Sequence, residues 1–258
     1  MEFDQAFEWK ERAYATDVPP LLEVKSLTSG KVQNINLNIQ PGEIVGIAGL
    51  MGSGRTELVR CLFGIDPIES GEIYVNGQKQ TIKNPRNAID AGLALIPEDR
   101  RMQGLVLEHS VKDNIILPIL SKVKKGTFID NKKSNDISNE FVQKLNIKTD
   151  HIFKQARLLS GGNQQKIVLA KWLANDPTVL MLDEPTIGVD IGAKTEIIEI
   201  IRAMAETGKA ILVISSELPE LLALSDRVVV MHDGEIKKEM TRKEIKSEEE
   251  LQYAIQGF

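Results

Sequence analysis

The stretch GLMGSGRTEL, residues 49–58, has the spacing of a loop that binds phosphate. Gly49, Gly54 and Thr56 fit the pattern G-x-x-x-x-G-K-[ST], whereas Arg55 stands where the pattern has lysine. Backbone N–H groups of such a loop and the following helix N-terminus converge and stabilise an anion, and the Thr56 hydroxyl is placed to ligate Mg²⁺. The Arg55 guanidinium keeps the positive charge but lacks the compact reach of a lysine. Taken alone, the pattern also fits a strand-to-helix turn with packing glycines.

Two adjacent carboxylates end an apolar run in VLMLDEP, residues 179–185. Asp183 at the end of a strand suits a water-mediated contact to Mg²⁺, and Glu184 suits a base that polarises an attacking water. The structural alternative is a strand-end aspartate that caps a loop. The pair therefore indicates phosphoryl chemistry only together with a phosphate-binding loop.

A second phosphate cradle is indicated by LSGGNQQK, residues 159–166. The serine hydroxyl of Ser160 and the N–H groups of Gly161 and Gly162 stand at the start of a helix, where an anion is stabilised. The structural alternative is an N-cap followed by an amphipathic helix over residues 163–174. That alternative leaves the double glycine without an explanation.

Strands that run into these motifs are expected to position them. The apolar run 43–49 predicts a short strand leading into the glycine loop, followed by a helix that ends at Gly64. Continuous apolar runs at 178–184 and 210–216 predict parallel strands that are covered on both faces, and residues 192–208 predict a helix between them.

The remaining segments predict further strands and a helical region. Alternation over 21–27 and 32–39 predicts half-buried strands, and 70–78 contains an Asn-Gly turn typical of an antiparallel hairpin. A second hairpin is predicted over 227–240, turning at Asp233-Gly234. Polar, lysine-rich stretches from about residue 111 to 163 predict helices.

Composition narrows the class of protein. The 258 residues are enough for one large domain or two small ones, and 42% of them are hydrophobic, so a packed core is expected. The net charge of −5 lacks the overall excess of positive charge that is typical of proteins that bind nucleic acid. The single cysteine, Cys61, excludes an internal disulfide framework, and the three histidines lack metal-ligand spacing. Without an apolar run of about 18 residues or a secretory N-terminus, we expect a soluble, cytoplasmic chain whose membrane connection is made through a partner.

Together the motifs resemble the nucleotide-binding domain of ABC transporters, and the resemblance extends over residues 21–240. The segments GIAGLMGSGRTEL, IPEDRRMQGL, LSGGNQQK and DEPTIGVDIGAK resemble in particular the C-terminal half of the tandem ATPase subunit of bacterial monosaccharide importers of the ribose, galactose and xylose type. The resemblance implies an ABC nucleotide-binding domain over residues 21–258. Residues 1–20, which end in Pro19-Pro20 and contain no expected core, are then an interdomain linker or tail.

The resemblance implies an α/β fold with a P-loop NTPase core of ABC type, an antiparallel β subdomain and a helical subdomain at about residues 100–170. The implied cofactors are ATP and Mg²⁺. The implied partners are the first nucleotide-binding half of the same tandem subunit, membrane permease subunits and, indirectly, a sugar-binding protein, with no nucleic acid. The chain is then expected at the cytoplasmic face of the cell membrane, held through the permease, with residues 98–114 and their Leu105, Val106 and Leu107 as a docking surface.

The resemblance also assigns roles to single residues. It implies catalytic roles for Glu184, Glu98 and Ser216, and Mg²⁺ ligation by Thr56 and Asp183. The residues expected to contact ATP are Gly49, Gly52, Ser53, Gly54, Arg55, Thr56, Ser160, Gly161, Gly162, Gln164 and Asp190.

Four departures from the family pattern concern the chain's own phosphate loop. Arg55 replaces the lysine, Glu98 stands where a glutamine senses the γ-phosphate and Mg²⁺, and Ser216 replaces the switch histidine. The aromatic residue that stacks on adenine is missing from SLTSGKVQN, residues 26–34. The cradle at Ser160, which such domains offer to the opposite domain, is intact. The sequence therefore predicts a degenerate site of its own and a complete half-site for its partner.

Three functions fit these observations to different degrees. The first, favoured by the whole motif set, is the second ATPase half of a sugar importer. The second is a non-transport ABC protein, which the missing lysine and the missing basic patch disfavour. The third is a regulatory domain that clamps ATP without hydrolysing it; Arg55 and Ser216 favour it, whereas Glu184 argues against it. The sequence does not identify the sugar.

Overall fold

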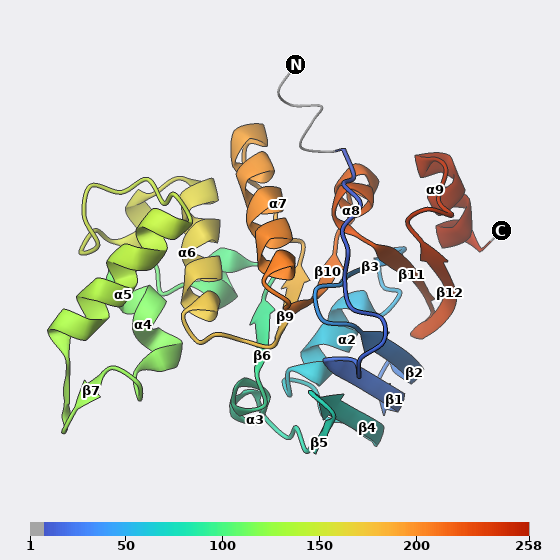
Figure 1. Cartoon of the computed structure of the whole chain (residues 1–258), viewed down its shortest axis with the longest axis horizontal. Coiled ribbons are helices and arrows are strands. Elements are labelled where there is room, and N and C mark those ends of the chain that lie inside the picture. Colours follow the sequence, from blue (N-terminus) through green and yellow to red (C-terminus); the bar gives the residue numbers. More distant parts are fainter. Residues whose placement is uncertain (1–7, 258) are drawn as a thin grey trace. The chain divides into compact units, whose positions relative to one another are not determined.

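The computed structural model describes residues 8–257, which divide into two compact units (Figure 1). The first unit contains the residues up to Leu95, Pro177–Pro185 and the residues from Ile198 onward. The second contains Ile96–Asp176 and Thr186–Ile197. Within residues 8–257, no helix has the length and apolar character needed to cross a bilayer.

The central sheet of the first unit carries the predicted apolar strands. Its order is β12-β11-β3-β10-β9-β6, and β11, β3, β10 and β9 run parallel to one another. Every residue of β9 and β10 is buried, as expected for continuous apolar runs in a sheet covered on both faces. The bounds are β3 (Ile44–Gly49), β6 (Leu93–Ile96), β9 (Val179–Asp183), β10 (Ala210–Ile214), β11 (Arg227–His232) and β12 (Glu235–Thr241).

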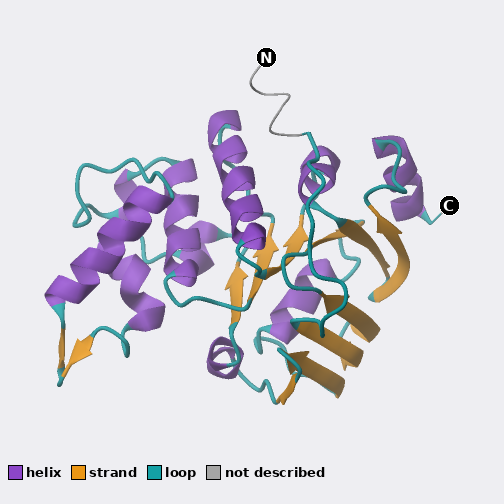
Figure 2. Cartoon of the chain, viewed as in Figure 1, coloured by secondary structure: helices purple, strands orange, loops and turns teal. Residues whose placement is uncertain are grey.

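A second sheet of the same unit is antiparallel, with the order β2-β1-β4-β5 (Figure 2). Its strands are β1 (Leu22–Ser29), β2 (Val32–Ile39), β4 (Ser70–Val75) and β5 (Gln78–Gln80). The turn between β4 and β5 places Asn76 and Gly77 at positive φ, as an Asn-Gly hairpin requires. Both predicted hairpins, including the one between β11 and β12, are confirmed.

Helices flank these strands. The helices of the first unit are α2 (Arg55–Leu62), α3 (Pro85–Asp90), α8 (Leu218–Leu224), α9 (Glu248–Gln256) and α7 (Ile191–Glu206) from Ile198 onward. Helix α2 follows β3 directly and packs against β3 and β9 through its buried Leu58, Val59 and Leu62. This packing fixes where the N-terminus of α2 points.

Part of the N-terminal segment is docked on the first unit, although no core residue was expected before residue 21. Arg12 makes an ion pair with Asp226, and both side chains are buried. The same guanidinium donates to the carbonyl of Gly42 over 3.2 Å, and Arg202 donates to the carbonyl of Glu8 over 2.8 Å. Residues 1–7 of the predicted linker lie outside the described residues.

The second unit is mostly helical (Figure 2). It contains α4 (Val111–Ile116), α5 (Asn131–Lys144), α6 (Gly161–Leu173), the start of α7, and a small hairpin of β7 (Lys124–Lys125) and β8 (Phe128–Ile129). A π-helical turn spans Arg100–Gly104, and 3-10 turns span Leu117–Ile119 and Ala156–Leu158. Helix α6 is not the amphipathic helix of the structural alternative, because all of its residues from Gln164 to Leu173 are buried. It packs against α4 and α5, so even its Lys166 and Lys171 are covered.

Candidate functional site

The glycine loop connects β3 to α2, and its shape requires glycine. Gly52 and Gly54 have φ values of +80° and +101°, which residues with a side chain rarely adopt. A Cβ on Gly49 would lie 2.5 Å from Ser53 Oγ and 2.6 Å from the carbonyl oxygen of Met231. The loop is held from the β11–β12 turn, where the N–H of Gly234 donates to the carbonyl of Ser53 over 2.9 Å.

Two features of this loop suit an anion. The N-cap of α2 is Gly54, so no side chain caps the N–H groups of the first helical turn. Ser53 Oγ is buried and has no hydrogen-bond partner within the described residues. A buried hydroxyl without a partner is costly, and a phosphate group at the helix N-terminus would satisfy both features.

The expected catalytic groups of the first unit gather at the carboxyl ends of its parallel strands. Glu184 follows β9, and its Oε2 accepts hydrogen bonds from the N–H and the Oγ of Ser216 after β10, over 3.0 and 3.1 Å. Arg55 Nη1 lies 3.5 Å from the carbonyl oxygen of the neighbouring Ser215. Glu184 has a φ of +49°, a strained value for a residue with a side chain, and such strain often accompanies function. Asp183, the last residue of β9, is buried.

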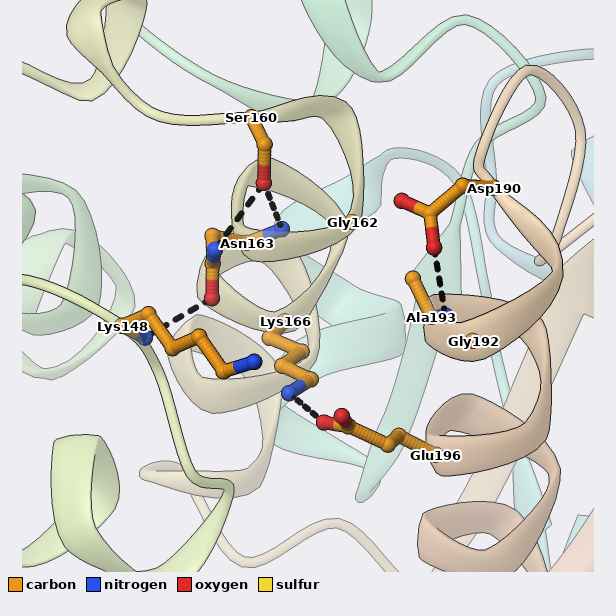
Figure 3. A pocket seen from close by; sticks show the side chains of 9 residues that line it. All are labelled: Lys148, Ser160, Gly162, Asn163, Lys166, Asp190, Gly192, Ala193 and Glu196. Atoms are coloured by element: carbon orange, nitrogen blue, oxygen red, sulfur yellow. Dashed lines mark hydrogen bonds and ion pairs between the residues drawn. The ribbon is translucent and has the colours of Figure 1, made fainter.

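The cradle of the second unit is built around the start of α6. Ser160 is the N-cap residue, and its Oγ accepts from Asn163 N over 3.4 Å and from Asn163 Nδ2 over 2.9 Å. These residues line a cavity of about 170 Å³ together with Lys148, Lys166, Asp190 and Glu196 (Figure 3). Asp190 caps α7 by accepting from the N–H of Ala193 over 3.0 Å.

The double glycine of the cradle has a packing cause that the sequence did not reveal. A Cβ on Gly162 would lie 2.4 Å from the Cβ of Ala193 on α7. A Cβ on Gly161 would lie 2.7 Å from Nη2 of Arg100, which donates to the carbonyls of Ile187 and Gly188 over 2.7 and 3.1 Å. The helix start therefore approaches α7 at Ala193 more closely than alanine at position 162 would allow.

The contact of Gln164 with ATP stays a prediction, but its side chain already has other partners. It is buried, and its amide donates to the carbonyls of Ala156 and Leu159, each over 3.2 Å. Gln164 therefore holds the preceding turn, and the cavity is lined instead by Asn163, one residue earlier. Asn163, Lys148 and Arg100 were not predicted, because nothing in the spacing distinguishes which residue of a helix start faces a cavity.

The predicted residues fall into two sets. Gly49 to Thr56, Asp183, Glu184 and Ser216 belong to the first unit, whereas Glu98, the Ser160 cradle and Asp190 belong to the second. Glu98 is exposed and lines a shallow pocket with Arg100 and Ile187. Partial burial, and then the neighbouring Arg101, lower the pKa of Arg100.

The predicted docking stretch 98–114 is mixed in character. Leu105 is buried, which removes it from a surface, whereas Val106 is 40% exposed. Met102, which lies in the predicted stretch but was not among its singled-out apolar residues, is 82% exposed. An apolar contact surface here would therefore use Met102 and Val106.

Comparison with known proteins gives the family. The sequence profile described as ABC transporter matches residues 32–187, which is more than half of the chain. The chain belongs to the ABC transporter family. Its parallel core with a glycine loop, its antiparallel sheet and its helical elements are therefore those of an ABC-type P-loop NTPase, as predicted.

Named relatives of this ABC chain include ribose import ATP-binding proteins. The protein of that name from Bacillus licheniformis is 46% identical over 238 residues, covering 92% of this chain and 48% of the relative. The one from Geobacillus kaustophilus is 48% identical over 216 residues, covering 83% and 44%. The chain thus spans about half the length of the curated relatives it matches.

Solved structures of low sequence identity share the fold. The structure of cbiO1 from Clostridium perfringens, part of an ABC transporter complex, has a TM-score of 0.76 at 22% identity and covers 92% of this chain and 95% of that one. The ATP-binding cassette MJ0796 bound to ADP and Pi has a TM-score of 0.73 at 22% identity, with coverage of 86% and 98%.

Proposed function

We propose that this chain is the second nucleotide-binding half of a tandem ATPase subunit that energises import of a monosaccharide through a membrane permease. The observation that carries the proposal is that one chain has two different glycine-containing helix starts that suit phosphate, the loop 49–56 and the cradle at Ser160. Each lies on its own unit, and neither contains every group that phosphoryl transfer needs. The names of the relatives and the half-length match support the sugar class and the tandem arrangement.

The first half-site fits a nucleotide triphosphate. The uncapped helix start and the unpartnered Ser53 hydroxyl suit phosphate oxygens, so Gly49 to Thr56 would hold the phosphates of ATP. Thr56 in the first turn of α2 and Asp183 at the end of β9 would hold Mg²⁺, which neutralises phosphate charge.

Hydrolysis at this first half-site is expected to be weak. Glu184 keeps a carboxylate that can polarise water, and Ser216 orients it through two hydrogen bonds. Ser216 carries no positive charge, however, and the Arg55 guanidinium lies beside a carbonyl of its own chain. These two residues favour an ATP-clamping role for this site, so clamping without hydrolysis is the second candidate function of the loop.

The cradle at Ser160 would complete the site of the first nucleotide-binding half. Its Ser160, Gly161, Gly162 and Asp190 would face ATP held by that half. We assign residues 21–258 to the nucleotide-binding domain, the second unit to its helical subdomain and residues 1–20 to the link with the first half. The permease would hold the chain at the cytoplasmic face of the membrane, and a sugar-binding protein would act indirectly.

The asymmetry of the two half-sites can be tested in the complete transporter. Ser160→Arg adds bulk and a misplaced charge to the cradle, and we expect it to remove most ATP turnover and sugar uptake. Donors aimed at a transferring group are each worth on the order of 10²–10³ in rate by analogy with oxyanion holes. Arg55→Ala is expected to weaken nucleotide retention at the second site and to leave a substantial part of transport.

A matched control separates a local effect from a general one. Ser247 caps α9 as Ser160 caps α6, accepting from Glu250 N over 3.3 Å, and lies outside both half-sites. Ser247→Arg is therefore expected to leave turnover close to that of the unchanged protein. If Arg55→Ala damages turnover as much as Ser160→Arg does, the two sites are equivalent in use and the degenerate-site proposal is wrong.

A further inference from the structure

Asn163 occupies a particular place at the cradle. It lies in the first turn of α6 and lines the same cavity as Ser160 (Figure 3). The oxygen and the nitrogen of its side-chain amide each make a hydrogen bond. The backbone N–H of Lys148 donates to Oδ1 over 2.8 Å, and Nδ2 donates to Ser160 Oγ over 2.9 Å.

The bond from Lys148 fixes which way the amide faces. A backbone N–H can only donate, so the atom of Asn163 that faces it must be the oxygen. The amide nitrogen is then turned to Ser160, and this assignment does not depend on distinguishing oxygen from nitrogen in the side chain. The segment at Lys148, 15 residues before Asn163, thus sets the direction of the whole chain of hydrogen bonds.

This arrangement determines what the Ser160 hydroxyl can do. A serine hydroxyl has one O–H donor and two acceptor lone pairs. Both lone pairs face N–H groups of Asn163, the amide Nδ2 and, over a longer 3.4 Å, the backbone N. The hydroxyl hydrogen must therefore point elsewhere, and it is available to an acceptor outside the helix turn.

We propose that Asn163 is a positioning residue that keeps the Ser160 hydroxyl a hydrogen-bond donor toward a phosphate oxygen, with the Lys148 backbone setting the orientation of the Asn163 amide. The inference rests on the proposed function, in which that phosphate belongs to ATP held by the other nucleotide-binding half. The cavity presents four charged side chains, of which Lys166 is ion-paired with Glu196, and Lys148 and Asp190 are the others. The hydrogen bonds from Lys148 N–H through the neutral Asn163 amide to Ser160 add no charge to this set.

Aspartate at position 163 provides an isosteric test. Its carboxylate can still accept from the Lys148 N–H, so the attachment of that segment remains. It cannot donate to Ser160 Oγ, and it offers an acceptor to the hydroxyl hydrogen instead. Asn163→Asp is therefore expected to turn the hydroxyl away from the phosphate while the chain stays folded.

The first experiment is a double-mutant cycle in the tandem protein assembled with its permease. Ser160→Ala is expected to reduce ATP turnover on the order of 10²-fold, as the loss of an aimed donor. Asn163→Ala is expected to reduce it about tenfold, as the loss of one hydrogen bond. If Asn163 acts through the hydroxyl, the double variant turns over ATP at the rate of Ser160→Ala alone. Losses that multiply overturn the inference and leave Asn163 with a merely structural role.

The second experiment is a pH profile, which a structural role would not change. Protonation returns an O–H donor to the carboxyl group that Asn163→Asp introduces, so the turnover of this variant relative to the unchanged protein is expected to rise several-fold between about pH 8 and pH 5.5. We expect phosphate charge at the cradle to outweigh the Lys148 N–H and the two lysine side chains of the cavity, and so to raise the pKa of this carboxyl group above the ordinary aspartate value of about 3.9. A flat ratio overturns the inference, and thermal unfolding verifies that each variant is folded.

The outcomes distinguish this inference from the proposed function. If Ser160→Ala leaves turnover unchanged, the cradle does not serve ATP hydrolysis, and the proposed function fails together with the inference. If Ser160→Ala reduces turnover while Asn163→Ala does not, the proposed function stands and the inference alone fails.

Discussion

At the residue scale, the two glycines of the cradle show how one sequence feature can have two causes. Both were predicted as N–H donors to a phosphate, and both are also needed where α6 approaches its neighbours. Gly162 meets a Cβ of α7, which is fixed to a helix backbone, whereas Gly161 meets the far end of the flexible Arg100 side chain. The two positions should therefore tolerate alanine to different degrees.

Gly162→Ala is expected to destabilise the chain by about 1–3 kcal/mol, the usual cost of overpacking. The added methyl would lie 2.4 Å from the Cβ of Ala193, so the combined Gly162→Ala, Ala193→Gly variant should recover most of that loss, apart from up to about 1 kcal/mol for glycine in a helix. Gly161→Ala serves as the control and should cost less. Urea unfolding measures these variants together with Ala193→Gly alone, and additive losses in the double variant would contradict the packing explanation.

At the element scale, the N-terminal segment is tied to the central sheet through one buried carboxylate. Asp226, just before β11, accepts from the N–H of Ile44 at the start of β3 over 2.8 Å and is ion-paired with Arg12. Tyr14 packs against Gly42, where a Cβ would lie 3.4 Å from the tyrosine Cβ. A segment held in this way would move with the sheet, unlike a free linker.

The Asp226 carboxylate makes a pH-dependent contribution to stability. Burial raises its pKa to about 6, above the roughly 3.9 of an unfolded chain, so the folded protein holds this proton more tightly. Stability from this group is therefore highest below about pH 4, is lost as the pH rises toward about 6, and is constant above that. Asp226→Asn is expected to lack this decrease, as measured by urea unfolding from about pH 4 to pH 7.

Asp66 provides a control whose contribution to stability depends on pH in the opposite direction. Its hydrogen bond with Arg60 lowers its pKa, so its contribution is present at neutral pH and is lost as the pH falls. Asp66→Asn should flatten that acid-side loss. The same pH slope in Asp226→Asn and in the unchanged chain would mean that Asp226 does not titrate in this range.

At the scale of the whole molecule, the chain by itself should be a poor ATPase. In the proposed function, a complete site needs a phosphate loop from one domain and a serine–glycine cradle from another, which a lone chain would supply only by pairing with a second copy. We expect turnover well below the range of about 1–10³ s⁻¹ that is typical of enzymes. Any residual rate per chain should rise with protein concentration and disappear in Ser160→Arg. A monomeric preparation with enzyme-like turnover would contradict this expectation.

The sequence by itself determined where the strands, turns and glycine loop lie and which polar residues stand at the ends of the strands. Apolar runs such as 179–183, the Asn-Gly turn and the glycine spacing of 49–54 are local signals, because each depends on the conformation of a few consecutive residues. They were enough for the parallel strands, both hairpins, the glycine loop between β3 and α2, and the carboxylates at the end of β9. The family followed from the order of the same motifs along the chain.

The tertiary structure alone decided which side chains meet. Arg55 reaches a carbonyl 160 residues away, and Glu184 is held by Ser216 after β10, contacts that no local pattern contains. The same holds for α6, which is buried along its length because α4 and α5 pack against it, so its sequence could not say that Gln164 faces inward and Asn163 faces the cavity. Burial depends on what surrounds an element, and that is set by residues far away in the sequence.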